Sequence, residues 1–192
     1  MITPEECRKK VKKALSEKRY RHTLNVCELA VELARRHGED PQKAATAALL
    51  HDYCKELPKE ELLQILHRNA IMAGDMEKRP QPLWHGVCAA IVAEEKGWVR
   101  DPEILNAMCC HTAGRVGMTS LDKILFLADM TSAERRWDGV EQLRMEAFDD
   151  LDAAMIHGLA MNLAWLRESG KPVDPLGEAA LRDLKERTGN AR

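Results

Sequence analysis

The stretch AATAALLHD, residues 44–52, joins a run of small and apolar side chains directly to the ionisable pair His51-Asp52. The run has the composition of a buried helix, so the pair that closes it would be buried too. Burying an imidazole and a carboxylate costs free energy unless each finds a partner. A divalent metal is a suitable partner, because neutral imidazole and ionised carboxylate are both natural metal ligands.

Two further ionisable residues stand in apolar surroundings. His22 lies one turn before Val26, in register with the apolar face of its helix, so its ring should point inward. Asp129 closes a second apolar run and lies one turn after Leu125, at the border of the expected core. Either residue alone would be read as a hydrogen-bonded core histidine or as a capping aspartate. The order His, His-Asp, Asp instead predicts one metal site built from three helices.

The adjacent pair sets a geometric condition on that site. Consecutive helical residues point about 100° apart, so His51 and Asp52 cannot chelate as an i, i+4 pair does. At a helix end, however, they can converge on one ion or share two. Mixed histidine and carboxylate ligation suits iron, manganese or zinc better than calcium. Lys55, one turn after His51, would place a positive charge beside the metal, although it could also be a solvated lysine at a helix end.

Composition excludes several classes of protein. The chain has 192 residues, 29 basic and 31 acidic, with a formal charge of −2, so no broad electrostatic surface for nucleic acid or membrane is expected. The N-terminus lacks the apolar stretch of a signal peptide, and no run is long enough to span a bilayer. The six cysteines form no Cys-x-x-Cys pair and are interpreted as reduced core thiols of a cytoplasmic protein, rather than as metal ligands or a redox pair.

Helix-start signals recur along the chain, as in the capping box Thr3-Pro4-Glu5-Glu6, and no strand-length alternating run or internal repeat is present. The sequence predicts an all-α, bundle-like single domain over residues 1–192, with an N-terminal helix (1–18), a metal-site core (19–139) and C-terminal helices (140–192). The predicted helices cover residues 3–18, 20–37, 40–54, 58–67, 85–96, 101–110, 119 to beyond 129, 140–168 and 174–187, and residues 69–82 are predicted to be a loop.

The C-terminal segment from Val140 to Glu168 carries many apolar side chains. A second copy of the chain could cover them in a homodimer, but packing on its own domain is the preferred interpretation. The four tryptophans, 84, 98, 137 and 165, are interpreted as core or interface anchors rather than as base-stacking platforms.

The ordered set of motifs, with His51-Asp52-x-x-Lys55 and Ala128-Asp129, resembles the HD-domain metal-dependent phosphohydrolases. Further segments narrow the resemblance to the YqeK-type branch, the symmetrical bis(5′-nucleosyl)-tetraphosphatases. These segments are Leu83-Trp84-His85-Gly86, His111-Thr112-Ala113-Gly114, residues 121–129 and residues 170–175. The resemblance spans nearly the whole chain after Arg19.

The resemblance implies hydrolysis of diadenosine tetraphosphate to two ADP molecules. It implies metal ligation by His22, His51, Asp52 and Asp129, with Asp52 and Lys55 catalytic. His85 and His111 would complete a second metal site or contact substrate phosphates, which Lys55, Thr112 and Arg135 would also hold. From the sequence alone, the alternatives are that His85 is an ordinary histidine of a first helical turn and that His111 caps the end of its helix. The expected cofactor is one or two divalent transition-metal ions, iron first, with manganese and zinc as alternatives.

The chain departs from the branch in one loop. After the last aspartate the branch continues with two apolar residues and Glu-Pro, whereas this chain has Met130-Thr131-Ser132-Ala133. The role of Arg135 therefore depends on an ungapped alignment past these residues. Two alternatives stay open: another HD-type nucleotide phosphohydrolase, acting on a deoxynucleotide or a guanosine alarmone, and a non-catalytic nucleotide-binding sensor.

Overall fold

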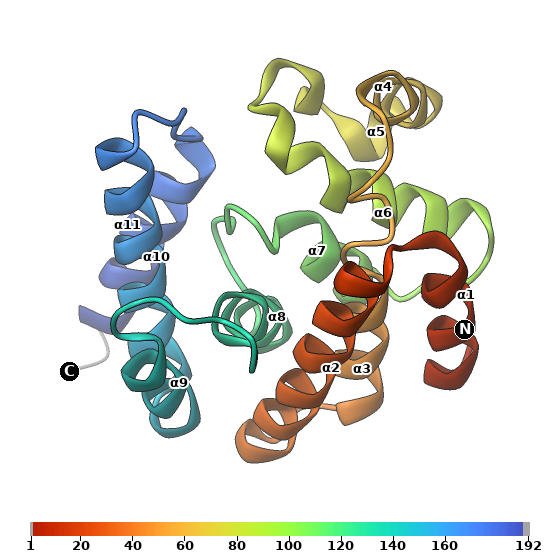
Figure 1. The fold of residues 1–192 in the computed structure, drawn as a ribbon. Helices are drawn as coiled ribbons and strands as arrows, with labels where there is room; N and C mark the ends of the chain where they lie inside the picture. Colours follow the sequence, from red (N-terminus) through yellow and green to blue (C-terminus); the bar gives the residue numbers. More distant parts are fainter. Residues whose placement is uncertain (1, 190–192) are drawn as a thin grey trace.

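The helix that carries Asp129, α8 (Ser120–Thr131), lies at the centre of the computed structural model, which describes residues 2–189 (Figure 1). Its residues Leu121 to Ala128 are all buried. It packs against α2 (Glu17–His37), α3 (Pro41–Leu50) and α7 (Pro102–Cys110), and also against α10 (Leu151–Glu168). A helix enclosed in this way must be apolar around its whole circumference, as residues 121–128 nearly are.

The predicted all-α class is confirmed, because residues 2–189 contain helices and no strand. The remaining α-helices are α1 (Pro4–Ala14), α4 (Lys59–Arg68), α5 (Ala70–Ala73), α6 (Trp84–Glu95), α9 (Val140–Asp149) and α11 (Pro175–Gly189). Two short 3₁₀ helices, η1 (Met76–Lys78) and η2 (Gln81–Leu83), precede α6. None of the described helices is both long and apolar enough to cross a membrane.

The predicted start signals act as caps. Thr3 and Thr119 each form a capping box, in which the threonine hydroxyl accepts a backbone N–H and the third helical residue bonds back to the cap. Asp40 and Asp101 cap α3 and α7 through their side chains. Gly38 ends α2 in the left-handed conformation (φ 73°), which a side chain would disfavour. These starts and this stop were therefore predictable from local chemistry.

The first helix ends earlier than predicted. It stops at Ala14 rather than near residue 18, because Leu15 is extended and Ser16 caps α2, which begins at Glu17 instead of Tyr20. Glu56 holds this corner by accepting hydrogen bonds from the Ser16 backbone N–H (2.7 Å) and hydroxyl (2.6 Å). The partner is 40 residues away, so no local pattern reveals it.

The third helix also ends early, at Leu50 instead of Cys54. Beyond it the chain tightens into turns in which the Tyr53 N–H bonds to Leu50 and the Lys55 N–H bonds to Asp52. Such i→i+3 bonds wind the chain more tightly than an α-helix does. The prediction that the His51-Asp52 pair stands at a helix end is confirmed.

The predicted C-terminal helix is two helices. α9 and α10 are separated at Asp150, which leaves helical geometry (φ −142°) and caps α10 by accepting from the N–H groups of Asp152 and Ala153. The loop predicted over residues 69–82 contains the short helices α5, η1 and η2. Short helical turns of this kind lack the periodic apolar face by which longer helices are predicted.

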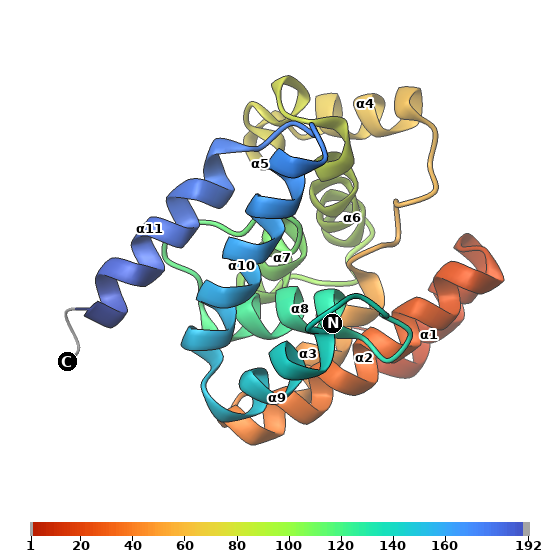
Figure 2. The same ribbon diagram turned by 60° about the vertical axis from the view of Figure 1, so that its left-hand side comes forward.

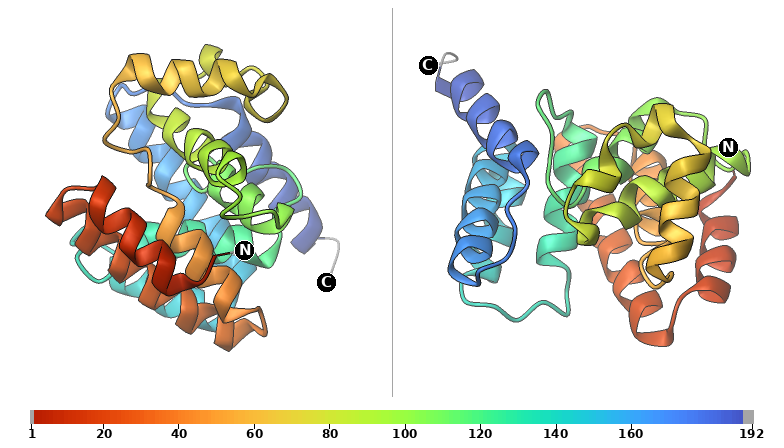
Figure 3. Two further views of the ribbon diagram at one scale, coloured as in Figure 1. Left: turned by 90° about the vertical axis from the view of Figure 1, so that its right-hand side faces the viewer. Right: turned by 90° about the horizontal axis from the view of Figure 1, so that it is seen from above.

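Helices α9, α10 and α11 form a layer on the side of α8 opposite α2 and α3 (Figures 2 and 3). Five apolar residues of α10 are buried: Leu151, Ala154, Met155, Leu159 and Leu163. The segment 140–168 therefore packs on its own domain, as preferred from the sequence. Trp165 is not a core residue, since 51% of it is exposed.

Helices α6 and α7 pack closely together at Gly86. A Cβ atom there would lie 2.7 Å from the Met108 carbonyl oxygen and 2.9 Å from the His111 ring. Neither group can move away freely, because Met108 belongs to the backbone of α7 and the His111 ring is bonded to it (Nδ1 to O, 2.7 Å). Only glycine therefore fits at this helical position.

We expect Gly86→Ala to destabilise the protein by at least about 1–2 kcal/mol, although glycine-to-alanine changes inside helices ordinarily stabilise by about 1 kcal/mol. Urea unfolding measures the effect. Gly158→Ala in α10 is the matched control, because its Cβ would lie at 3.4 Å from its nearest neighbours, an ordinary contact distance. Equal stability changes in the two variants would contradict the close approach at Gly86.

Candidate metal centre

Four histidine rings converge on the Asp52 carboxylate. They come from α2 (His22), the end of α3 (His51), the first turn of α6 (His85) and the residue after α7 (His111). Their Nε2 atoms lie 3.7, 3.4, 3.0 and 3.9 Å, respectively, from an Asp52 oxygen. All five side chains are buried. Residues that are distant in the sequence are thus gathered around one carboxylate.

Three of these rings are oriented in the same way. The Nδ1 atom of each lies within hydrogen-bond distance of the backbone carbonyl three residues upstream: Ala48 for His51 (2.6 Å), Pro82 for His85 (2.8 Å) and Met108 for His111 (2.7 Å). A carbonyl only accepts, so Nδ1 must carry the proton and donate it. In the neutral ring, Nε2 then presents a lone pair towards Asp52. This second-shell arrangement is typical of metal-ligating histidines.

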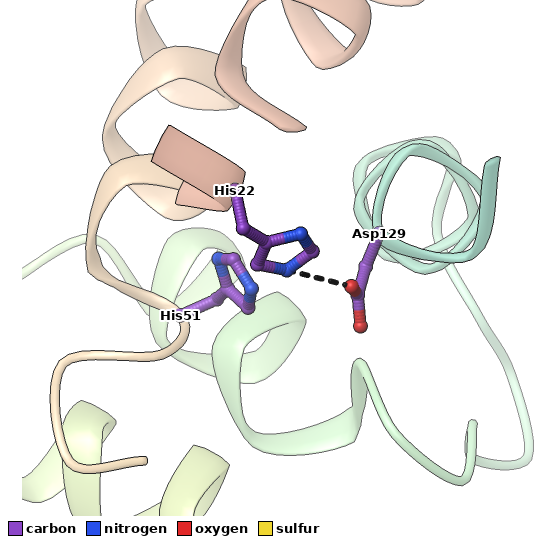
Figure 4. Close-up of side chains that lie close together, drawn as sticks. All are labelled: His22, His51 and Asp129. Atoms are coloured by element: carbon purple, nitrogen blue, oxygen red, sulfur yellow. Dashed lines mark ion pairs between the residues drawn. The ribbon is translucent and has the colours of Figure 1, made fainter. Parts of the chain in front are cut away.

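Asp129 of α8 faces the same space. Its Oδ1 atom lies 3.1 Å from His22 Nε2 (Figure 4). Two overlapping sets of side chains each bring one possible ligand atom within 4.8 Å of the others: His22, His51 and Asp129, and His51, Asp52 and His111. Because the sets share His51, the arrangement can hold one ion or two neighbouring ions.

The polar atoms of this cluster are suited to bind a cation, because they cannot all pair with one another through hydrogen bonds. His22 Nε2, His51 Nε2 and Asp52 Oδ1 are buried and lack a hydrogen-bond partner within the described chain. The Nε2 atoms of His85 and His111 lie 3.1 Å apart, although both rings use Nδ1 as the donor. Unpaired buried polar atoms cost roughly 1–3 kcal/mol each. A divalent metal ion would satisfy these atoms, because all of them are nitrogen or oxygen donors.

Burial and neighbouring charges shift the pKa values of several groups in the cluster. Burial, with the neighbouring rings His51 and His85, lowers the pKa of His111 to about 3, and burial also lowers the pKa of His85. At Asp52 burial acts to raise the pKa, but His51 and His85 hold it well below its usual range. At His51 burial acts to lower the pKa, but Asp52 outweighs it and raises the pKa. His111, His85 and Asp52 therefore stand ready to bind a metal at neutral pH.

Three cations surround the acidic ligands. Arg19 Nη1 donates to Asp52 Oδ2 (2.9 Å), and Arg135 Nη2 donates to Asp129 Oδ1 (2.8 Å). Lys55 Nζ lies 3.3 Å from His85 Nε2, and its burial lowers the pKa of its ammonium group. These groups leave positive charge beside the cluster, as binding of a phosphate requires.

Sequence reasoning missed Glu134. Its Oε1 accepts from His22 Nδ1 and from the Ser132 hydroxyl (2.8 Å), while its Oε2 accepts from Asn25 Nδ2 (2.6 Å). Burial acts to raise the pKa of Glu134, but the bond from His22 and the other two bonds lower it to about 2. Glu134 thus does for His22 what backbone carbonyls do for the other three rings. The sequence did contain a signal for it. Where the branch pattern has a glutamate this chain has Ser132, and a glutamate follows two residues later, at position 134.

The remaining predicted site residues lie beside the cluster. Thr112 follows His111 and lines a cavity together with Arg135. Arg135 reaches Asp129 despite the altered residues between them. The other histidines lie elsewhere and are bonded to groups outside the cluster: His37 to Ala147, His67 to Glu77 and His157 to Glu146. The six cysteines are free, and five of them are buried, as the sequence predicted.

The family model for the HD domain matches residues 19–134. This match contains His22, the His51-Asp52 pair and Asp129, the residues that the structure brings together. The chain belongs to the HD domain family. The resemblance noted from the motifs is thereby confirmed.

Curated relatives cover most of the chain. It is 40% identical over 165 residues to the symmetrical bis(5′-nucleosyl)-tetraphosphatase of Bacillus subtilis, covering 86% of this chain and 88% of the relative. It is 37% identical over 146 residues to the enzyme of the same name from Staphylococcus aureus, covering 76% and 74%. A crystal structure of a predicted HD superfamily hydrolase from Clostridium acetobutylicum, described as involved in NAD metabolism, superposes with a TM-score of 0.91 at 33% identity, covering 97% of this chain and 99% of that one.

We expect Glu134→Ala to weaken divalent-metal affinity about 10–100-fold, the usual effect of removing a histidine's second-shell partner. Glu134→Gln keeps an acceptor for His22 Nδ1 and should lose less. Titration of the purified protein against a chelating metal indicator measures the affinity. Glu141→Ala, at an exposed glutamate of α9, is the control. Unchanged affinity in Glu134→Ala would show that the carboxylate does not orient His22.

Proposed function

We propose that the protein is a metal-dependent hydrolase of dinucleoside polyphosphates that cleaves diadenosine tetraphosphate symmetrically into two ADP molecules. The observation that carries the proposal is the convergence of four Nε2 lone pairs and two carboxylates on one buried space, with cations at its edge. The relatives named symmetrical bis(5′-nucleosyl)-tetraphosphatase support the choice of substrate. One water molecule is consumed, and the anhydride bond between the second and third phosphorus atoms breaks.

His22, His51, Asp52 and Asp129 are proposed as the ligands of a first ion, with His85 and His111 free to complete a second site or to contact phosphate. A bound divalent metal supplies a water molecule of lowered pKa and neutralises phosphate oxygens. Iron is the ion we propose first, with manganese or zinc as alternatives. The donors are imidazole nitrogens and carboxylate oxygens, and no thiolate belongs to either described ligand set, so the site suits these borderline metals.

The neighbouring side chains would bind the polyphosphate. Lys55 contributes an ammonium group beside His85, and Arg135 a guanidinium group beside Asp129. Both can donate to non-bridging phosphate oxygens, and the negative charge that grows on the departing ADP needs such donors. Thr112 offers a hydroxyl group at the same edge. Arg19 donates a hydrogen bond to Asp52 Oδ2 and adds a third positive charge beside the cluster.

We propose that residues 1–192 act as one domain, because residues of α10 line the cavity beside Asp129. A cytoplasmic location is supported by the six cysteines, all of which are free. The homodimer stays a prediction, which size-exclusion chromatography with light scattering would test.

Replacing His51 or Asp52 by alanine should lower kcat/KM for diadenosine tetraphosphate by at least about 100-fold, because each change removes a proposed ligand of the centre. Product identification should give ADP alone from the unchanged protein. His157→Ala is the matched control, since that ring is bonded to Glu146 away from the cluster. Full hydrolysis by either cluster variant would refute the mechanism.

Metal removal gives a second test. Treatment with EDTA should abolish hydrolysis and lower the Tm, since the ligands tie α2, α3 and α8 together and buried polar atoms are left unpaired. Metal analysis of protein purified without added metal identifies the ion. A panel of substrates that includes deoxynucleotides, a guanosine alarmone and NAD distinguishes the alternatives. Tight nucleotide binding with no product under any metal would identify a sensor instead.

A further inference from the structure

Two cavities adjoin the metal centre. The first, of about 870 Å³, has His111 and Asp129 in its wall, and the second, of about 590 Å³, has Lys55 in its wall. Both volumes lie in the usual range for small-molecule sites, roughly 300–1,000 Å³. Four residues belong to both cavities: Thr112, Arg135, Asn162 and Trp165. The cavities are therefore two arms of one site that meet beside the proposed ligands.

The period of α10 explains why there are two arms. Side chains three and four residues apart share a face of a helix. Met161, Ala164 and Glu168 line the first arm, whereas Leu159, Leu163 and Leu166 line the second. Asn162 and Trp165 lie between these two faces and contribute to both arms. One helix thus forms a ridge with an arm on each side.

Each arm offers surfaces that suit a nucleoside. The first contains the aromatic rings of Phe126 and Trp137 as well as Trp165. The second is lined mainly by apolar side chains and by Lys171, whose Nζ lies 3.9 Å from the centroid of the Trp165 ring. Aromatic faces bind nucleobases by stacking. A half-exposed tryptophan at the junction of two cavities is better explained by a bound ring than by core packing.

Charge places the phosphates between the arms. The cations Arg135 and Lys55 lie where the arms meet the metal centre. The acidic side chains Asp138 and Glu168 line the first arm, away from the second, and suit hydroxyl or amino donors rather than phosphate. A polyphosphate would therefore run through the junction, with its uncharged ends directed into the arms.

We propose that the two arms each bind one nucleoside of a dinucleoside polyphosphate, so that the middle of its phosphate chain lies against the metal centre. This inference rests on the proposed function for the class of substrate. It accounts for symmetrical cleavage by position: with a nucleoside held on each side of the ridge, the central anhydride is the bond nearest the ligands. The two ADP products then occupy separate arms.

The test fills each arm separately. Ala164→Trp places a large ring in the first arm and Leu166→Trp places one in the second, whereas Arg167→Trp, at a position that lines neither arm, is the control. The probe is diadenosine tetraphosphate with a methylene group in place of the central bridging oxygen, which cannot be cleaved symmetrically. Calorimetry of the metal-loaded protein measures its Kd, with ADP as the ligand carrying one nucleoside.

We expect one analogue molecule per chain, bound at least tenfold more weakly by each arm variant and unchanged by the control, because losing one of two linked contacts removes the gain from the link. ADP needs only one arm, so at most one of the two arm variants should weaken its binding tenfold. If either arm variant binds the analogue within twofold of the wild type, one nucleoside lies outside the arms and the proposal is wrong. Metal content and thermal unfolding of each variant verify its folding.

A crystal structure with the analogue gives an independent check on the unmodified protein. A nucleoside in each cavity supports the proposal, and a second nucleoside extending into solvent overturns it. Binding across both arms without turnover of diadenosine tetraphosphate would remove the proposed function and leave this inference intact. Turnover of diadenosine tetraphosphate, with binding of the analogue weakened in only one arm variant, would support the proposed function and overturn this inference.

Discussion

The structure depends on one unusual arrangement: the Nε2 lone pairs of four histidines and the oxygens of Asp52 face one another in a buried space. Four imidazole rings turn Nε2 towards Asp52. Within residues 2–189, three of the atoms involved lack any hydrogen bond: His22 Nε2, His51 Nε2 and Asp52 Oδ1. Such an arrangement is unfavourable by several kcal/mol unless a cation occupies it. The fold tolerates it because a hydrogen bond at Nδ1 fixes each ring, with a backbone carbonyl or Glu134 as the acceptor.

The fold and the centre are built from the same contacts. The carbonyls that orient His51, His85 and His111 belong to the helix ends or turns immediately before them, so forming that local structure also sets the ring. Gly86 shows how little freedom remains, since a single methyl group there would meet both the Met108 carbonyl and the His111 ring. Packing of α6 on α7 is therefore part of the chemistry of the site and not only of the core.

Sequence alone predicted the helices wherever local chemistry decides their ends, as at Thr119 and Asp101. It predicted that His22, His51, Asp52 and Asp129 come together because polar residues in apolar runs are rare, whereas His85 and His111 were added by the family resemblance. It failed where a distant partner decides. Leu15 leaves the helix at a corner that Glu56 holds by bonding to Ser16 from 40 residues away, and Glu134 joins His22 across more than a hundred residues. The two arms were likewise unpredictable, because they depend on how α10 lies against α8.

The order in which the chain leaves the ribosome gives the position of Glu134 a consequence. Every proposed ligand, and the Glu134 carboxylate that orients His22, has been synthesised before any of α9, α10 or α11 exists. The ligand set is thus complete in the chain before the helix that lines the substrate arms has been made. Changes in α10 can therefore alter which substrate the arms accept while every proposed ligand stays in place.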